Sequence, residues 1–187
     1  MGISARNAVF EASGVLVAVD SPMRVRNLRF FLMVFAALVA APAFAACDDP
    51  TWDTSTVMAR LAAAVPVAAG QSLDRGAPSG LTVPLAPVSG VPFDVPPERP
   101  PRNPDPRGAV LHFDAGAAGT YRVALSARAW IDVVENGKYL APVAFVDFMD
   151  CADLHKIVAF DIGAGPFTLQ LSDATAPSVS IALTRAP

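Results

Sequence analysis

Histidine is scarce in this 187-residue chain, which contains only His112 and His155. His112-Phe113-Asp114 is a single His-x-Asp pair, and His155 is the only other histidine, so no closely spaced set of two histidines and a carboxylate is present. The chain also lacks a nucleophile elbow, a phosphate-binding loop, a zinc motif and a dinucleotide-binding fingerprint. Because an active site needs acids, bases and nucleophiles in one cluster, these absences favour a non-catalytic protein.

The same scarcity leads us to predict no cofactor and no metal. Iron is the alternative, since two histidines and a carboxylate are its minimum set of ligands. Those ligands would be His112, His155 and one of Asp132, Glu135 and Asp153. Three aspartates between residues 147 and 153 are of the type that binds calcium. They lack the spacing of an EF-hand loop, and a solvated turn is the simpler interpretation.

Basic residues are few after residue 45. Residues 1–45 carry four of the 14 basic residues and two of the 17 acidic ones, which leaves 10 basic and 15 acidic residues and a net charge of −5. A mildly acidic domain without a basic stripe argues against binding to nucleic acid or to an anionic membrane surface.

Only one long apolar run is present, Phe30–Ala41, and it is shorter than the roughly 20 residues of a spanning helix. Basic residues precede it at 24, 26 and 29, and the small residues Ala43 and Ala45 follow it, which is the pattern of a secretory signal peptide. We expect translation to start at Met23, with residues 1–22 an over-extended gene start and 23–45 a cleaved signal. The mature protein would begin at Ala46, without a membrane span, and be periplasmic or secreted.

The two cysteines, Cys47 and Cys151, both lie in the exported part, where oxidation is permitted. Their even number favours one disulfide between them. They do not form a Cys-x-x-Cys motif, so redox catalysis is not expected. The alternative is a lipoprotein in which Cys47 is the acylated first residue, although Phe44 stands where leucine is usual.

Two local patterns divide residues 46–107. Apolar residues at helical spacing predict a short helix over Thr54–Val65, capped by Thr54 or Ser55 and packed on a sheet. Nine prolines in the 23 residues of 84–106 exclude a helix and inner strands. That segment is predicted to be a stiff connector wrapped over the fold, with a docking segment for a partner as the alternative.

Strand signals dominate residues 108–187. Apolar and polar residues alternate along 121–126, 167–172 and 178–184. Asn136-Gly137 predicts a tight hairpin between the apolar runs Trp130–Val134 and Tyr139–Val146, and Lys156–Ile162 is a further run. Leu81–Leu85 is predicted as an edge strand, because Pro84 is tolerated only there. We therefore predict an all-β fold: an antiparallel β-sandwich or jelly-roll-like domain over 108–187, with a short N-terminal helix after the signal peptide.

Trp130 and Asp132 are the candidate ligand-binding residues. In a strand they share one face, while Ile131 points to the other. An exposed tryptophan beside an acid is a plausible platform for a sugar, which would make the protein a carbohydrate-binding module. The alternative is that Trp130 fills the edge of the sandwich core.

Short blocks across about 71–186 resemble a group of small exported bacterial proteins. The matching blocks are Gly119–Leu125, Ala129–Val134, Gly137, Cys151, His155–Phe160, Gly165 and Leu169–Leu171. Members of the group often carry the label homogentisate 1,2-dioxygenase, which implies an iron-dependent ring-cleaving enzyme. The blocks are also similar to non-catalytic β-sandwich accessory domains found after secreted peptidases.

Similar proteins tend to carry a histidine-rich turn before the cysteine, where this chain has Phe145–Met149. We therefore expect a periplasmic accessory or binding protein without catalytic activity, whose partner is a periplasmic protein or a glycan. The iron-dependent dioxygenase and the carbohydrate-binding module are the alternatives.

Overall fold

The computed structural model describes residues 47–74 and 79–186. The predicted gene start at 1–22 and the predicted signal peptide at 23–45 lie outside these residues. Within the described part, no helix combines the length and the apolarity needed to cross a membrane.

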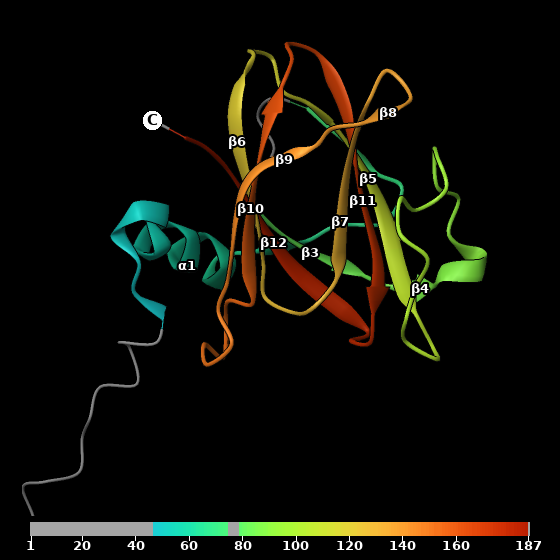
Figure 1. The fold of residues 1–187 in the computed structure, drawn as a ribbon, viewed down its shortest axis with the longest axis horizontal. Helices are drawn as coiled ribbons and strands as arrows, with labels where there is room; N and C mark the ends of the chain where they lie inside the picture. The colour runs from blue at the N-terminus through green and yellow to red at the C-terminus, as the bar shows by residue number, and fades with distance from the viewer. Residues whose placement is uncertain (1–46, 75–78, 187) are drawn as a thin grey trace, which may run out of the picture. The chain divides into compact units, whose positions relative to one another are not determined.

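Two six-stranded β-sheets form a sandwich (Figure 1). Sheet A contains, in order across the sheet, β1 (Val65–Pro66), β3 (Gly80–Pro84), β12 (Ser178–Arg185), β6 (Gly119–Leu125), β10 (Lys156–Ile162) and β9 (Pro142–Asp147). Sheet B contains β2 (Ser72–Leu73), β5 (Arg107–Asp114), β11 (Pro166–Ala174), β7 (Trp130–Glu135) and β8 (Lys138–Tyr139), and β4 (Ala86–Pro87) pairs with β5. Except for the parallel pairs β1–β3 and β2–β5, the paired strands are antiparallel. The predicted all-β sandwich is confirmed.

The alternating strands fill the space between the sheets. In β6, Val123 and Leu125 belong to the central core, whereas Ala124 packs on the opposite side of sheet A. Leu169 and Leu171 of β11 join the same central core from sheet B. The period of two therefore sorts each strand into a core face and an outer face.

The sandwich begins earlier than the predicted core at 108–187, because β1 to β4 lie within residues 65–87 and join both sheets. β3 is not the predicted edge strand, since it lies between β1 and β12. Its Pro84 is tolerated because β1 pairs only with Leu81 and Thr82. On that side Pro84 has no neighbouring strand, so its missing N–H group removes no hydrogen bond from the sheet.

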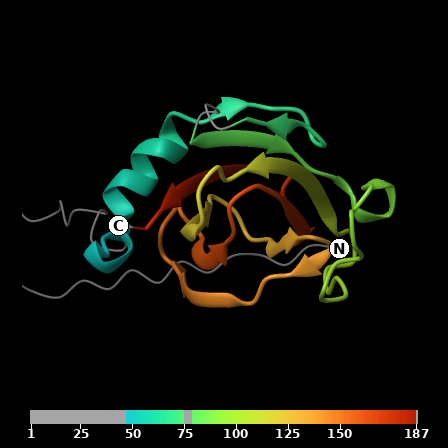
Figure 2. The ribbon, with the colours of Figure 1, turned by 90° about the horizontal axis from the view of Figure 1, so that it is seen from above.

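Helix α1 (Thr54–Ala62) follows a 3₁₀ turn at Pro50–Trp52 and covers the outer face of sheet A (Figure 2). Asp53, and not Thr54 or Ser55, is its N-cap residue. The helix ends before the predicted Val65, because Val65 and Pro66 pair with β3.

Small residues let the helix approach the sheet closely. Val57 and Leu61 pack on Ala124 and Ala182 of sheet A. A Cβ atom on Gly80 would lie 2.0 Å from the carbonyl oxygen of Arg60, so only glycine fits where β3 passes the helix.

The predicted disulfide between Cys47 and Cys151 is confirmed, with the two Cα atoms 5.2 Å apart. Cys151 packs against the cluster beneath α1. The disulfide therefore fastens the N-terminal end of the described chain to the loop before β10. A sulfur held in a disulfide is not free for acylation, so the structure contradicts the lipid-anchor alternative for Cys47.

The predicted hairpin at Asn136-Gly137 is present, with φ of 52° and 71° at the two turn residues and a two-residue loop between β7 and β8. The predicted strand Tyr139–Val146, however, is two strands in different sheets. β8 ends at Tyr139 in sheet B, and β9 begins at Pro142 in sheet A. Pro142 has no N–H group with which to extend β8, and the chain crosses between the sheets just before it.

The proline-rich segment lies across the outer face of sheet B, on the opposite side of the sandwich from α1 (Figure 1). We call residues 91–106 the strap. The side-chain oxygen of Gln170 accepts hydrogen bonds from the N–H groups of Asp94 (2.9 Å) and Val95 (3.3 Å), and its Nε2 donates to the Val95 carbonyl oxygen (3.0 Å). Gln170 is fully buried by this arrangement. The strap thus closes a sheet face that would otherwise be open to water.

Candidate ligand-binding cleft

A cleft lies along the part of β7 that has no second partner strand. β8 pairs only with Val134 and Glu135, so residues 130–132 are paired with β11 alone. The cleft has a volume of about 340 Å³ and reaches from the strap to β9 and β10 of sheet A. We call it the edge cleft. Ile131, Val158 and Phe160 line it and are buried, so its floor is the side of the sandwich core.

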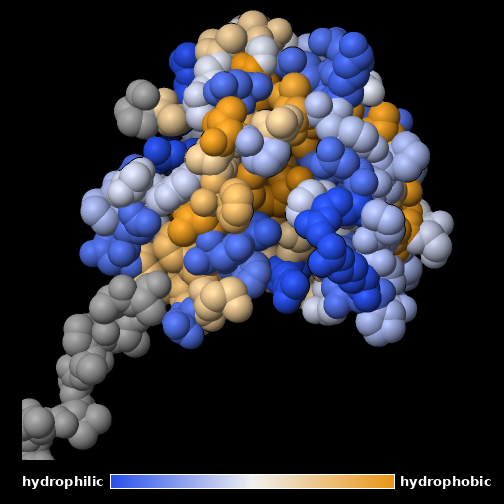
Figure 3. Space-filling model, in the orientation of Figure 1, coloured by the Kyte–Doolittle hydropathy of each residue, from blue (hydrophilic) through white to orange (hydrophobic). Residues whose placement is uncertain are grey.

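Exposed apolar side chains gather at this edge. Four large apolar residues are exposed in the described part of the chain, and three of them, Val143, Phe145 and Met149, lie in or next to β9. Phe145 is 66% exposed and lines the edge cleft together with Leu140. Figure 3 shows apolar surface in the middle of this face with strongly polar side chains beside it. Such concentrations of apolar surface mark binding sites more often than isolated apolar residues do.

The structure places the predicted pair Trp130 and Asp132 in the wall of the edge cleft. Trp130 Nε1 donates a hydrogen bond of 2.7 Å to Asp132 Oδ1, and Glu98 N donates one of 3.2 Å to Asp132 Oδ2. The guanidinium carbon of Arg99 lies 4.3 Å from the centre of a Trp130 ring. Arg99 therefore occupies a face of the indole that a flat sugar platform would leave free.

Asp132 is 3% exposed, and burial raises the pKa of its carboxyl above the ordinary value of 3.8, although the hydrogen bonds from Glu98 and Trp130 oppose the rise. Between 3.8 and the raised pKa, the folded protein binds more protons than the unfolded chain. The contribution of Asp132 to stability is therefore largest below this window and falls as pH rises through it.

Asp132→Asn should remove this pH dependence. The variant loses one acceptor at every pH, but the difference in unfolding free energy between it and the wild type should shrink as pH rises from below 3.8 through the raised pKa of Asp132. Urea unfolding of both proteins across this range measures the difference. A difference that stays constant with pH would contradict the role assigned to burial.

A second hollow of about 250 Å³ adjoins the edge cleft, and Arg99, Trp130, Asp147 and Lys156 line both. We call it the basic hollow. Its cationic residues come from the strap, from the turn before β7 and from the start of β10: Arg99, Arg102, Arg128 and Lys156.

His155 also lines the basic hollow, and its pKa is lowered by burial and by the neighbouring Lys156 charge. The neutral imidazole is therefore favoured at neutral pH.

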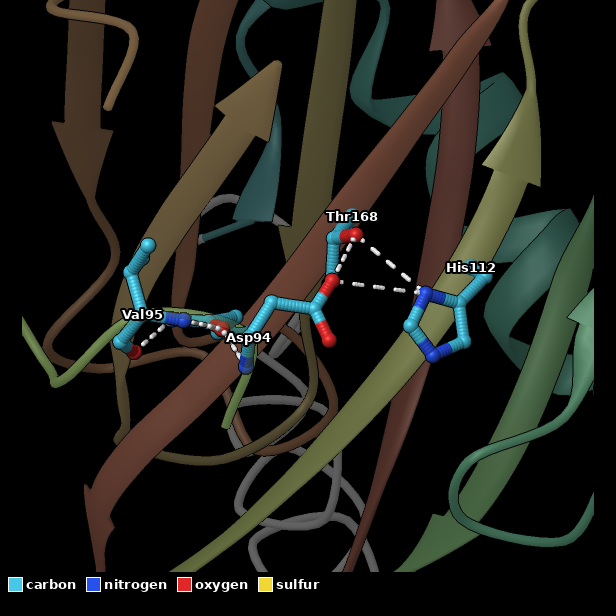
Figure 4. Close-up of polar contacts among 5 residues, drawn as sticks. Asp94, Val95, His112 and Thr168 are labelled. Atoms are coloured by element: carbon cyan, nitrogen blue, oxygen red, sulfur yellow. Dashed lines mark hydrogen bonds and ion pairs between the residues drawn. The ribbon is translucent and has the colours of Figure 1, made fainter. Parts of the chain in front are cut away.

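His112 lies elsewhere, on the outer face of sheet B. In Figure 4, Thr168 Oγ1 donates to Asp94 Oδ2 (2.6 Å), and His112 Nδ1 lies 3.2 Å from Thr168 Oγ1 and 3.6 Å from Asp94 Oδ2. These contacts join the strap to β5 and β11.

The structure does not bring the two histidines together, since His112 is in sheet B and His155 precedes β10 of sheet A. Among residues 47–74 and 79–186, no group of three or more histidine, cysteine, aspartate or glutamate residues is arranged to hold a metal ion. This applies to the iron alternative and to the aspartates at 147, 150 and 153. Asp147 is instead paired with Lys156, at 3.5 Å between Oδ1 and Nζ.

Sequence reasoning found two residues of the cleft wall, Trp130 and Asp132, but missed Arg99, Phe145 and Lys156. Proline content identifies the strap as an extended connector, but no local signal shows that Arg99 docks on Trp130. In the sequence, Phe145 cannot be told from an apolar strand residue of the core. It is exposed because β9 lies at the edge of sheet A.

The cleft, the hollow and the strap are therefore the features from which a function can be inferred. In comparisons with family models, with curated proteins and with solved structures, this chain matched none.

Proposed function

We propose that this protein is an exported, non-catalytic binding protein, working in the periplasm or outside the cell, whose ligand occupies the edge cleft. The observation that carries the proposal is the combination of a buried apolar floor with exposed Phe145 at the opening. Small-molecule sites are typically concave and mostly apolar, with a few polar groups that orient the ligand. The confirmed disulfide agrees with an oxidising compartment.

The dimensions and the chemistry of the cleft favour a small ligand. A volume of about 340 Å³ lies at the lower end of the range of ligand pockets, roughly 300–1,000 Å³. Charged groups of Glu98, Arg99 and Lys156 line the same cleft as the apolar floor. A molecule with an apolar body and a polar end matches both parts.

The alternatives receive less support. An iron-dependent dioxygenase, as the resemblance implies, needs two histidines near one carboxylate, whereas His112 lies in β5 of sheet B and His155 lies in the loop before β10 of sheet A. A carbohydrate-binding module needs an open aromatic face, and Arg99 lies over Trp130.

A neutral fluorescent probe, N-phenyl-1-naphthylamine, tests the apolar part of the proposal. We expect the wild type to bind it with a rise in fluorescence and Phe145→Ser to weaken binding about tenfold, since burying a phenyl side chain contributes about 1.5–3 kcal/mol. Fluorescence titration of both proteins gives the ratio of Kd values.

Val65→Ser is the matched control, because Val65 is an exposed apolar residue on β1, outside the set that lines the edge cleft. Its Kd should equal that of the wild type. The proposal fails if the probe does not bind, or if Phe145→Ser and Val65→Ser bind it equally well.

A further inference from the structure

The basic hollow concentrates positive charge on an acidic protein. The described part of the chain contains nine lysine and arginine residues, and four of them line this hollow: Arg99, Arg102, Arg128 and Lys156. Two carboxylates, Asp147 and Asp173, line it as well. The balance of charge around the hollow is therefore positive, whereas the sequence after residue 45 carries a net charge of −5.

The arginines of the hollow differ from those elsewhere in how their guanidinium groups are used. Each of the others in the described part donates a hydrogen bond to a backbone carbonyl oxygen: Arg60 to Leu183, Arg107 to Leu85, Arg122 to Thr51 and Arg185 to Ala118. Arg99 stacks on Trp130 instead. For Arg102 and Arg128, no described residue accepts a hydrogen bond from the guanidinium group or forms an ion pair with it.

Neither carboxylate forms an ion pair with the guanidinium group of Arg102 or Arg128. Asp147 pairs with Lys156 at 3.5 Å. Asp173 Oδ1 accepts hydrogen bonds from the backbone N–H groups of Arg102 (2.9 Å) and Asn103 (2.8 Å), and so holds the end of the strap. Two guanidinium groups thus remain available to an acceptor from outside the chain.

We infer that the ligand is an organic anion, with its apolar body in the edge cleft and its oxyanion, a carboxylate, sulfonate or phosphate, in the basic hollow. This inference rests on the proposed function. Guanidinium groups bind such oxyanions with paired, charge-assisted hydrogen bonds. The cleft and the hollow share four lining residues, so a single ligand can extend from one into the other.

Two probes that differ by one sulfonate test the inference. 8-Anilinonaphthalene-1-sulfonate is the anionic counterpart of N-phenyl-1-naphthylamine. At low salt we expect the wild type to bind the anionic probe about tenfold more tightly than the neutral one, because one charge-assisted hydrogen bond contributes about that factor in affinity. Added sodium chloride should reduce this preference by screening.

Arg102→Gln/Arg128→Gln should abolish the preference, so that the two probes bind with similar Kd values. Arg122→Gln/Arg185→Gln is the matched control, because it removes the same charge at residues outside the hollow, and it should keep the preference. Thermal unfolding of the wild type and of both double variants confirms that each is folded.

Competition against the bound anionic probe identifies the oxyanion. Octanoate, octanesulfonate and octyl phosphate should each displace the probe better than octanol does, and the strongest of the three anions shows which oxyanion is preferred. Equal displacement by all four compounds would overturn the inference, and so would equal binding of the two fluorescent probes. In either case binding of the neutral probe would leave the proposed function standing, whereas failure of both probes to bind would contradict that function itself.

Discussion

Replacing both cysteines, in Cys47→Ser/Cys151→Ser, is expected to lower the free energy of unfolding by about 4–5 kcal/mol. The bond joins residues 104 apart in sequence, and closing so long a loop removes much conformational freedom from the unfolded chain. The loss is a large share of the roughly 5–15 kcal/mol that stabilises a typical domain. Urea unfolding of the variant and of the oxidised wild type measures the loss.

Reduction provides the internal control. Adding a reductant should destabilise the wild type by a similar amount and should not affect the double variant, which has no bond to break. If the reduced wild type unfolds at the same urea concentration as the oxidised protein, then the loop closed by Cys47 and Cys151 does not contribute as proposed.

Gln170→Ala is expected to cost about 3 kcal/mol and to release the strap from sheet B. The substitution removes three hydrogen bonds to Asp94 and Val95 at a side chain with no exposed surface. A buried backbone group left without a partner costs about 1–3 kcal/mol. Urea unfolding gives the free energy, and hydrogen exchange at the Asp94 and Val95 amides reports release of the strap.

The matched control is Ser172→Ala, two residues along the same face of β11. Ser172 is also buried, but its hydroxyl has no hydrogen-bond partner among the described residues. Removing it should therefore leave stability unchanged or slightly raised. The role assigned to Gln170 would be refuted if the Asp94 and Val95 amides stayed protected in Gln170→Ala, or if both variants lost the same free energy.

In the proposed function, the strap would also link stability to ligand binding. It supplies Glu98 and Arg99 to the edge cleft and Arg102 to the basic hollow. The same contacts of Gln170 and Asp173 that cover sheet B therefore hold three charged groups of the site in place. Release of the strap would leave the apolar floor intact while removing part of the positive charge.

Local patterns predicted much of the sandwich. The apolar run Lys156–Ile162 has the same bounds as β10, and Asn136-Gly137 forms the expected two-residue turn. These features depend on neighbouring residues alone: side chains alternate along a strand, and glycine and asparagine accept positive φ. The disulfide was predicted because the exported part contains two cysteines and no third one competes for either of them.

Pairing between distant strands decided what local patterns did not show. The run Tyr139–Val146 looks like one strand, but its halves pair with β7 in sheet B and with β10 in sheet A. That division leaves β8 short and β9 at an edge, which opens the cleft beside β7 and exposes Phe145. The sequence places Trp130 and Asp132 on one face but does not show that the strap covers it.

By itself, then, the sequence determined the fold class, the strand alternation, the tight turn and the cysteine pair, because each depends on spacing along the chain. The tertiary structure decided where the strap lies and which charges meet at the basic hollow. Arg102, Arg128 and Lys156 belong to three separate segments. Their meeting depends on which edges the two sheets bring together, and contacts between segments far apart in the sequence leave no periodic trace in it.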